Sequence, residues 1–373
     1  MRIAFDGRAI HDRFPGIGRY AYNLALALAR TQPDLELAVL HDPRQPNTRY
    51  SLAALQAYAN VRLTPVDAPT FAPAEQWRVP RALRAVGAQV YHSPYYVMPY
   101  RPGVPTVVTV HDLIPLIPAA GYGRRARWLF AVSVRLAVRA AQRVITVSAA
   151  AAADLTHILR VPPHQVVTIP EAADPAFAPQ PPERVAALRA RLGLPERYLL
   201  YVGSNKPHKN LERLVRACLR LESAPPLMVA GPWEARYSAV RAIVEQAAAE
   251  ARVRFLGPVA ADDLPALYTG AALFVFPSLY EGFGLPPLEA MACGAPVACS
   301  SATSLPEVVG DAALLFDPAS ETEIAAALRR ALEGDALPAD LRRRGLAQAA
   351  RFSWDRAATQ TAAIYRALAA ESA

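Results

Sequence analysis

The sequence predicts an α/β protein with two doubly wound domains, because short apolar runs typical of buried strands alternate with helical patterns in two successive series. The first series has such runs at 2–5, 35–40, 61–66, 89–91, 106–110, 144–147 and 166–169. The second series has them at 198–202, 227–230, 253–256, 273–276, 296–298 and 313–316. The 373 residues are enough for two domains, each with its own core.

A change in composition marks the boundary between the two series. Residues 171–195 contain five prolines, which indicates a stiff connection with a short helix inside it. We therefore expect an N-terminal domain over 1–175, a linker over 176–196 and a C-terminal domain over 197–353. Helical patterns in the second domain are expected near 210–222, 235–251, 262–269, 287–293 and 321–333.

Basic charge is confined to the first half of the chain. Residues 1–180 hold 19 arginines against 11 acidic residues, giving +8, whereas residues 181–373 hold 21 basic and 21 acidic residues. Arginine makes up 38 of the 40 basic residues, which indicates coding bias, but bias alone would spread the charge over the whole chain. The split predicts an anionic partner or surface for the first domain. Its most basic part is 123–130, and Arg135, Arg139 and Arg143 are expected to continue it along one helix face.

Composition also excludes several classes of protein. No run of about 18 strongly apolar residues occurs, and the start of the chain is typical of a strand rather than a signal peptide, so a cytoplasmic protein is expected. The cysteines Cys218, Cys293 and Cys299 have no metal-ligand spacing and are expected to be buried free thiols. No Asp-x-Asp sequence occurs that could hold a cation on a diphosphate. We expect no essential metal and no nucleic-acid partner.

The segment 280–294 carries the most informative motif. It follows the apolar run 273–276 with a glycine turn, and its Pro287 suits the first turn of a helix. Glu281 is expected in the turn and Glu289 in the first helical turn. Both carboxylates can then face a ligand at the helix N-terminus, whose free N–H groups attract phosphate or sugar oxygens. The helix dipole would also stabilise an acidic residue there without any ligand.

The pattern from Glu281 to Glu289 and on to the following Gly-Ala-Pro-Val resembles the signature of the retaining glycosyltransferases of family 4. In that family the first glutamate lies by the donor sugar and the second binds the nucleotide ribose. The resemblance implies these roles here, with Phe283, Gly284 and Leu285 also at the donor. It also implies the GT-B fold, in which two Rossmann-like domains face a deep cleft and a last helix, here in 354–373, crosses back to the first domain.

A loop with both lysines of the chain opens the second series. Lys206 and Lys209 stand within four residues, and a compact ammonium suits phosphate. The loop is not a Walker loop, because no second glycine precedes the lysine. The resemblance implies that Lys209 binds the donor diphosphate, with Ser204 and Lys206 beside it. The family commonly has an arginine there as well; none occurs between 203 and 210, so Lys206 or His208 is expected to replace it.

A glycine pair near the N-terminus allows two interpretations. Gly16 and Gly18, with Ala21, match a dinucleotide fingerprint, which would indicate an NAD enzyme. That fingerprint needs its first glycine directly after the strand, whereas Gly16 comes ten residues after Asp6. The resemblance instead implies that Gly16 and Gly18 let the backbone approach the donor diphosphate. It also implies that the backbone near Val259 recognises the base.

Polar residues follow two strands of the first series, where ligands of parallel sheets bind. His111 and Asp112 follow the run 106–110, and Tyr95 follows the run 89–91. A histidine at a strand end is often purely structural, but the resemblance implies that His111 reaches the donor sugar. Together with Glu281 and Lys209 it forms the expected catalytic set. Asp112 and Tyr95 are expected to contact the acceptor.

These observations predict a retaining glycosyltransferase that moves a hexose from a nucleotide sugar to an acceptor hydroxyl. The segments 111–115 and 6–8 most resemble bacterial mannosyltransferases, which implies GDP-mannose as donor; UDP-glucose is the alternative. A sugar or lipid-linked glycan is the expected acceptor, and peripheral contact with the anionic inner face of the cytoplasmic membrane is expected as well. A nonhydrolysing UDP-sugar epimerase and a non-catalytic nucleotide-sugar binder remain the other classes.

Overall fold

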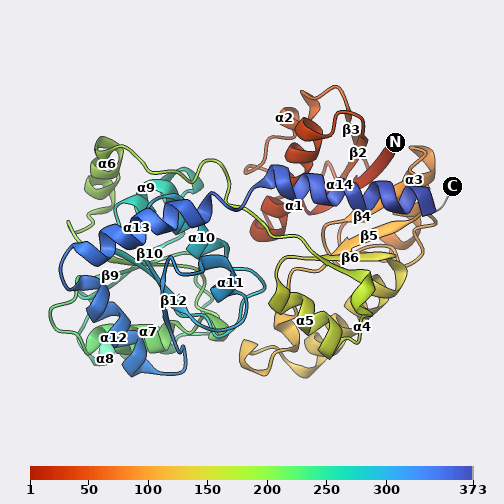
Figure 1. The fold of residues 1–373 in the computed structure, drawn as a ribbon. Helices are drawn as coiled ribbons and strands as arrows, with labels where there is room; N and C mark the ends of the chain where they lie inside the picture. Colours follow the sequence, from red (N-terminus) through yellow and green to blue (C-terminus); the bar gives the residue numbers. More distant parts are fainter. Residues whose placement is uncertain (372–373) are drawn as a thin grey trace. The chain divides into compact units, whose positions relative to one another are not determined.

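The structure, a computed structural model, describes residues 1–371 apart from the side chains of Pro15 and Ala119. These residues form two compact units (Figure 1). The first unit comprises Met1–Leu116, Gly123–Glu171 and the chain from Ser353 onwards; the second comprises Ile117–Tyr122 and Ala172–Phe352. The last two residues of the expected segment 354–373 lie outside the described residues.

The first unit contains a seven-stranded parallel sheet in the order β3-β2-β1-β4-β5-β6-β7. Its strands are β1 Arg2–Asp6, β2 Glu36–His41, β3 Val61–Pro65, β4 Val90–Ser93, β5 Thr106–Thr109, β6 Arg143–Thr146 and β7 Val166–Thr168. The strand order reverses between β1 and β4. Ligands of doubly wound sheets bind beyond the carboxyl ends of the strands at such a switch point.

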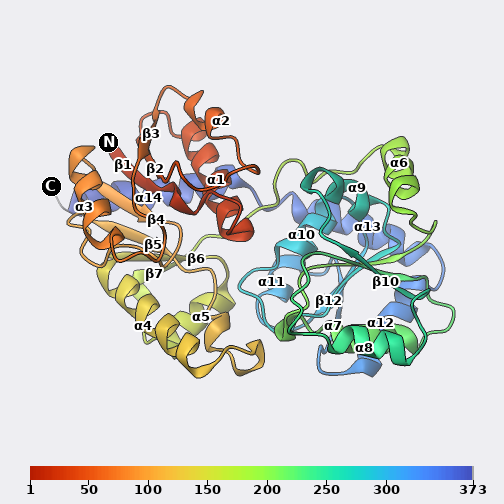
Figure 2. The same cartoon turned by 180° about the vertical axis from the view of Figure 1, so that it is seen from behind.

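Helices cover both faces of this sheet. They are α1 Pro15–Thr31, α2 Leu52–Gln56, α3 Glu75–Ala85, α4 Arg124–Ala140, α5 Ala149–Ile158 and α14 Trp354–Glu371. Successive residues of a strand point to opposite faces of the sheet, so the side chains of Tyr91 and His92 face different helix layers. Tyr91 lies in the core with residues of α3, α4 and α5, and Figure 2 shows α4 and α5 side by side. His92 contacts Tyr365 of α14, which packs along α1 (Figure 1).

The second unit contains a six-stranded parallel sheet in the order β10-β9-β8-β11-β12-β13, which reverses between β8 and β11. Its strands are β8 Leu199–Val202, β9 Leu227–Ala230, β10 Val253–Gly257, β11 Leu273–Phe276, β12 Val297–Ser300 and β13 Leu314–Phe316. Its helices are α6 Pro182–Leu192, α7 Leu211–Leu219, α8 Ala239–Gln246, α9 Leu264–Thr269, α10 Leu285–Ala292, α11 Leu305–Val309, α12 Glu321–Leu332 and α13 Ala336–Ala349. Helices α7, α8 and α12 lie together on one side, and α9, α10 and α13 on the other (Figure 1).

Several elements differ from the sequence expectation. The stretch 176–196, expected as a linker with a short helix inside it, contains the helix α6, but this stretch belongs to the second unit, where α6 packs against α9. Helix α13 was not expected at all: it buries few apolar residues, and its Gly345 packs against Met291 of α10. Helix α8 is shorter than the expected 235–251 at both ends, and at its C-terminal end the positive φ of 48° at Ala248 does not allow the helix to continue.

Two expectations about side chains are resolved by the fold. The three cysteines are free and buried as expected, and burial raises the pKa of the Cys218 thiol to about 12. The expected arginine series on one helix face is partly wrong, because α4 ends at Ala140 and Arg143 lies in β6, where it pairs with Glu371 at 3.0 Å.

Within residues 1–371, no helix combines the length and the hydropathy needed to span a bilayer.

Candidate active site

The connection between β11 and α10 has a fixed backbone. Gly284 has a φ of +125°, and a Cβ atom there would lie 2.7 Å from Leu305 Cδ2, so both its conformation and its surroundings require glycine. The Ser304 hydroxyl donates to the carbonyl oxygens of Glu281, at 3.0 Å, and Phe283, at 2.6 Å. These contacts hold Glu281, a buried residue, at the carboxyl end of β11.

Lys209 and Glu281 form an ion pair at the switch point of the second sheet. Lys209 Nζ lies 2.6 Å from Glu281 Oε1 and 5.2 Å from the centre of the Phe276 ring. The two side chains are only 17% and 10% exposed, so solvent ions screen the pair less than a surface pair. An ammonium has three N–H donors and can hold phosphate oxygens while it still donates to Glu281.

Asn210 places this lysine, and the sequence reasoning missed it. Its φ is +58°, a left-handed conformation that asparagine adopts more readily than most residues. Its buried side chain donates to the carbonyl oxygens of Pro277 at 2.9 Å and Pro318 at 2.7 Å, which ties the loop after β8 to the end of β11. An asparagine directly before a helical pattern was the available signal.

His208 does not provide the second cation considered for the diphosphate. Burial and the neighbouring Lys209 lower the pKa of His208 to about 4, so its imidazole is neutral near pH 7. Its Nδ1 has no hydrogen-bond partner within the described part of the chain. Lys206 remains as the second basic side chain of the loop; it is 32% exposed and lies 3.4 Å from Glu234.

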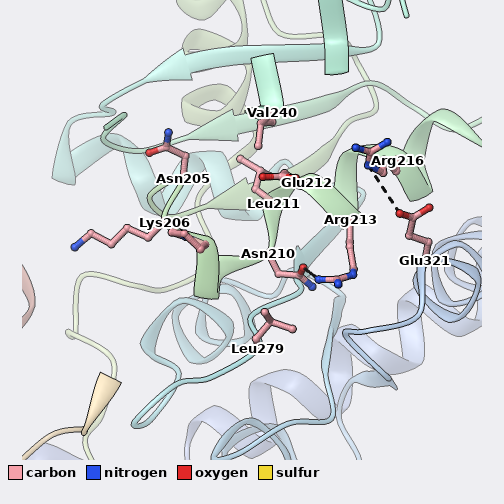
Figure 3. A pocket seen from close by; sticks show the side chains of 11 residues that line it. Asn205, Lys206, Asn210, Leu211, Glu212, Arg213, Arg216, Val240, Leu279 and Glu321 are labelled. Atoms are coloured by element: carbon pink, nitrogen blue, oxygen red, sulfur yellow. Dashed lines mark hydrogen bonds and ion pairs between the residues drawn. The ribbon is translucent and has the colours of Figure 1, made fainter. Parts of the chain in front are cut away.

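A cavity of about 350 Å³ lies beside this loop (Figure 3). Lys206 and Asn210 contribute to its lining, but Lys209 and Glu281 do not. Its arginines already have protein partners, because Arg213 donates to Asn210 Oδ1 at 2.8 Å and Arg216 lies 3.9 Å from Glu321. The cavity therefore neighbours the ion pair of Lys209 without containing it.

Glu289 lies deeper than the sequence indicated. Helix α10 begins at Leu285, so Glu289 lies in the second turn rather than the first. It is 3% exposed, and the Tyr268 hydroxyl donates to its Oε2 at 3.2 Å. The expectation of a first-turn carboxylate is wrong in position, because the helix starts two residues before Pro287.

The remaining donor-site candidates of the second unit follow strands of the same sheet. Ser204 follows β8, and its carbonyl oxygen accepts a 2.7 Å hydrogen bond from the Tyr201 hydroxyl. Val259 is half-buried and follows β10, after Gly257 with its positive φ of 72°. Like Glu281 after β11, these residues lie at the carboxyl edge of the parallel sheet.

Gly16 and Gly18 lie inside the first turn of α1, directly after its N-cap Phe14. The Gly18 N–H already donates to the Phe14 carbonyl at 2.7 Å, and a Cβ atom on Gly18 would lie 3.0 Å from the Ala9 carbonyl oxygen. A Cβ atom on Gly16 would meet nothing within 4 Å. The backbone is therefore open to a ligand at Gly16, whereas Gly18 serves helix packing.

His111 is held at both ring nitrogens. Nδ1 lies 2.9 Å from Glu171 Oε1, and Nε2 lies 2.9 Å from the Pro94 carbonyl oxygen. A carbonyl oxygen and an ionised carboxylate are both acceptors, so this arrangement favours the ring with protons on both nitrogens. Burial opposes this charge, but the hydrogen bond and the charge of Glu171 outweigh burial and raise the pKa of His111. The Tyr20 ring packs edge-on against it at 4.6 Å.

Of the two acceptor-site candidates, Asp112 follows His111 in the chain, and Tyr95 follows Pro94, whose carbonyl oxygen lies 2.9 Å from His111 Nε2. Asp112 Oδ1 accepts a 2.8 Å hydrogen bond from the Ile114 N–H, which shapes the loop after β5. Tyr95 follows β4, and its ring lies 4.3 Å from that of Tyr96. Both residues are partly exposed.

The arrangement suits an anionic, hydroxyl-rich ligand. The second unit offers a cation beside a carboxylate at a switch point, where Lys209 suits phosphate oxygens and Glu281 accepts hydrogen bonds from hydroxyls. Among residues 1–371, no group of three or more His, Cys, Asp or Glu is placed to hold a metal ion.

The fold and this site define a glycosyltransferase of the GT-B fold, and comparisons with known proteins support that class. Residues 15–177 match the family described as Glycosyltransferase Family 4, and residues 186–348 match Glycosyl transferases group 1. O-antigen chain mannosyltransferase B from Escherichia coli is 34% identical over 385 residues, which cover 99% of this chain and 100% of that protein. The chain belongs to glycosyltransferase family 4, and the resemblance inferred from the motifs is confirmed.

Solved structures confirm the fold. Sucrose-phosphate synthase from Thermosynechococcus elongatus superposes with a TM-score of 0.78 at 24% identity, over 100% of both chains. HepE from Anabaena, in complex with UDP and glucose, superposes with a TM-score of 0.74 at 20% identity, over 97% of this chain and 98% of that one. The predicted GT-B class of two Rossmann-like domains is therefore correct.

Proposed function

We propose that this glycosyltransferase moves mannose from GDP-mannose to a hydroxyl of a sugar or lipid-linked glycan, with retention at the anomeric carbon. The observation that carries the proposal is the pair of Lys209 and Glu281 at the carboxyl end of the second sheet. It supplies a cation for the diphosphate next to an acceptor for sugar hydroxyls. The choice of mannose is supported by the similarity to O-antigen chain mannosyltransferase B.

Departure of the nucleotide is assisted by fixed charges rather than by a metal ion. Lys209 stabilises the diphosphate as the glycosyl bond breaks, and the Leu285 N–H at the start of α10 adds to this stabilisation; Pro286 and Pro287, which follow it, have no N–H. Its contact with Glu281 keeps the ammonium in position before the donor binds. Glu289 contributes to ribose binding through the carboxylate that Tyr268 holds.

The first unit binds the acceptor, near Asp112 and Tyr95. His111 lies beside this region, and its hydrogen bond to Glu171 and the charge of Glu171 raise its pKa and favour its protonated form. Both of its ring nitrogens donate within the unit, so its ring can contact the donor sugar through a hydrogen bond only if one of these two bonds breaks.

A panel of nucleotide sugars tests the proposal. GDP-mannose and UDP-glucose are compared by the shift in melting temperature and by nucleotide release with mannose-containing acceptors. The anomeric configuration of the product is read by NMR. We expect GDP release that depends on acceptor and an α-linked product. Release of UDP from UDP-glucose instead would indicate glucosyl transfer. Turnover of a UDP-N-acetylhexosamine without acceptor would indicate an epimerase. Binding of a nucleotide sugar without release of nucleotide would indicate a non-catalytic protein.

We also propose that transfer takes place in the cytoplasm, at an anionic membrane surface contacted by α4. Trp128 and Leu129 are 63% and 48% exposed, and Arg124 and Arg125 beside them are also exposed. The helix Arg124–Ala140 contains no acidic residue. Exposed aromatic and basic side chains on one helix suit the interface of a membrane that contains anionic lipids.

A further inference from the structure

Four aromatic side chains gather at the carboxyl edge of the first sheet, and we call them the aromatic surface: Phe14, Phe71, Tyr95 and Tyr96. The Phe14 ring lies 5.8 Å from Tyr95 and 6.1 Å from Phe71, and Phe71 lies 6.2 Å from Tyr95. Three separate connections bring them together, those after β1, β3 and β4. Because β1 and β4 flank the switch point, the surface lies where a doubly wound sheet binds its ligand.

Phe71 is the most exposed ring of this surface. Its side chain is 53% exposed, although a phenylalanine gains most stability from full burial. Its backbone has a φ of +67°, a strained conformation for a bulky residue without a special reason to adopt it. A ligand that packs on the exposed ring would give this exposure a function.

Polar groups border the rings. The Arg13 guanidinium lies 5.7 Å from the centre of the Phe14 ring. The His11 ring packs against Phe14 at 5.0 Å and is only 2% exposed. His11 Nδ1 accepts a 3.2 Å hydrogen bond from the Arg13 N–H, so the proton of the neutral ring lies on Nε2, which has no partner among the described residues. Nε2 is itself buried, so the Arg13 guanidinium is the bordering group that would suit hydroxyl oxygens next to an apolar ring face.

We propose that the aromatic surface binds a sugar ring of a glycan acceptor, one or more residues away from the sugar that receives the new linkage. A pyranose presents C–H groups on one face and hydroxyls around its rim. The C–H face packs on the electron-rich face of an aromatic ring, and the hydroxyl rim matches the Arg13 guanidinium. The proposal rests on the proposed transfer to a glycan and makes the acceptor an oligosaccharide rather than a single sugar.

Acceptors of increasing length test this proposal. The wild type and Phe71→Ala are compared with mannose, a mannobiose and a mannotriose as acceptors, at saturating donor. Phe71→Ala should raise the KM for mannotriose about tenfold, equivalent to about 1.4 kcal/mol, and remove the preference for longer acceptors. The kcat/KM for mannose and the donor KM should stay within about twofold. Phe71→Tyr should restore the preference, and Trp77→Ala, which removes a 60% exposed ring on α3, should not change it.

Binding measured without donor separates this proposal from the proposed function. Saturation-transfer NMR should show mannotriose contacting the wild type but not Phe71→Ala. If no donor is turned over and this difference remains, the glycan site stands and the transfer function fails. The glycan site is overturned if the wild type transfers sugar and the Phe71→Ala variant has the same kinetics as the wild type. It is also overturned if the variant loses activity equally with all acceptors. A loss confined to lipid-linked acceptors would assign the surface to a lipid and would also overturn it.

Discussion

The ammonium of Lys209 lies 2.6 Å from the carboxylate of Glu281, although 72 residues separate them in the chain. One residue stands in the loop after β8 and the other in the loop after β11, the two strands between which the order of the second sheet reverses. The parallel sheet therefore brings together two charges that the sequence assigned to separate motifs. Each one sets the electrostatic surroundings of the other.

Lys209→Ala should lower kcat/KM roughly a hundredfold, because removal of a preorganised charge from a developing anion typically costs about 3 kcal/mol. Lys206→Ala is the matched control: its ammonium is more exposed and lies 3.4 Å from Glu234, so its loss should have a smaller effect. Steady-state kinetics with both variants, checked for folding by melting temperature, measures the difference. A folded Lys209→Ala enzyme with near-normal kcat/KM would contradict the role of Lys209.

Glu281→Gln and Glu289→Gln should differ in their kinetics. The first change removes the charge that holds Lys209 and should mainly lower kcat, because the ammonium is then less well placed in the transition state. The second should mainly raise the donor KM through the ribose. Equal mild effects on both parameters, with unchanged melting temperatures, would return both residues to structural roles.

Transfer should survive removal of divalent cations. The proposed leaving-group stabilisation uses the charge of Lys209 rather than a metal ion, so incubation with EDTA should leave the rate of GDP release within about twofold. The rate is measured before and after addition of Mn²⁺ or Mg²⁺ in excess over the chelator. Loss of activity in EDTA that either metal restores would refute the proposed metal-free mechanism.

The strand pattern of the sequence predicted the fold well, because buried parallel strands are recognisable as short apolar runs. The runs 227–230 and 273–276 coincide with β9 and β11, and most others shift by one or two residues. Helix α13 escaped prediction, since its apolar residues form no clear buried stripe: only Leu341, Gly345 and Gln348 are buried, and Gly345 packs against Met291. Its stability comes from tertiary contacts, which no local pattern records.

The site was less predictable than the fold. The sequence motifs indicated Glu281 and Lys209 as candidates, but they did not show that the two side chains form one ion pair. Asn210 acts through two carbonyl oxygens that lie far away in the sequence. The charge of His111 depends on Glu171, 60 residues further on, and that dependence appears only once β5 and the following connections are folded.

Glu75 should make the stability of the first unit depend on pH. Burial raises the pKa of Glu75 to about 7, while Arg8 opposes this shift and Asp6 adds to it. The folded state therefore binds this proton more tightly than the unfolded state, whose value is near 4.5. The resulting stabilisation is fully present at low pH and is lost as the pH rises from about 4.5 to about 7.

Glu75→Gln removes this titration but keeps a side-chain oxygen for Arg8, which lies 3.3 Å from Glu75. The variant should gain stability relative to the wild type between pH 5 and pH 8, by at most about 3 kcal/mol, because one pKa unit is worth about 1.4 kcal/mol. Urea unfolding at both pH values measures the change. A difference between the two proteins that does not vary with pH would contradict the raised pKa.

Anionic vesicles should bind the protein through the exposed end of α4. Trp128 and Leu129 can enter the interface, while Arg124 and Arg125 interact with anionic headgroups, each contributing roughly 1 kcal/mol at low ionic strength. Sedimentation with vesicles of phosphatidylglycerol and phosphatidylcholine should therefore bring down the protein at low salt. High salt or neutral vesicles should weaken binding at least tenfold, because salt screens the charges.

Replacement of Arg124, Arg125 and Trp128 by serine should reduce vesicle binding to the level seen at high salt. These side chains are exposed, so the melting temperature and transfer to a water-soluble acceptor should not change. Serine at Arg329 and Arg330, two exposed arginines on α12 of the second unit, provides a control that removes the same number of arginines from a different surface. An equal loss of binding in that control would indicate attraction by net charge alone. Binding that ignores lipid charge, salt and both sets of substitutions would exclude α4 as the membrane contact and leave a soluble acceptor.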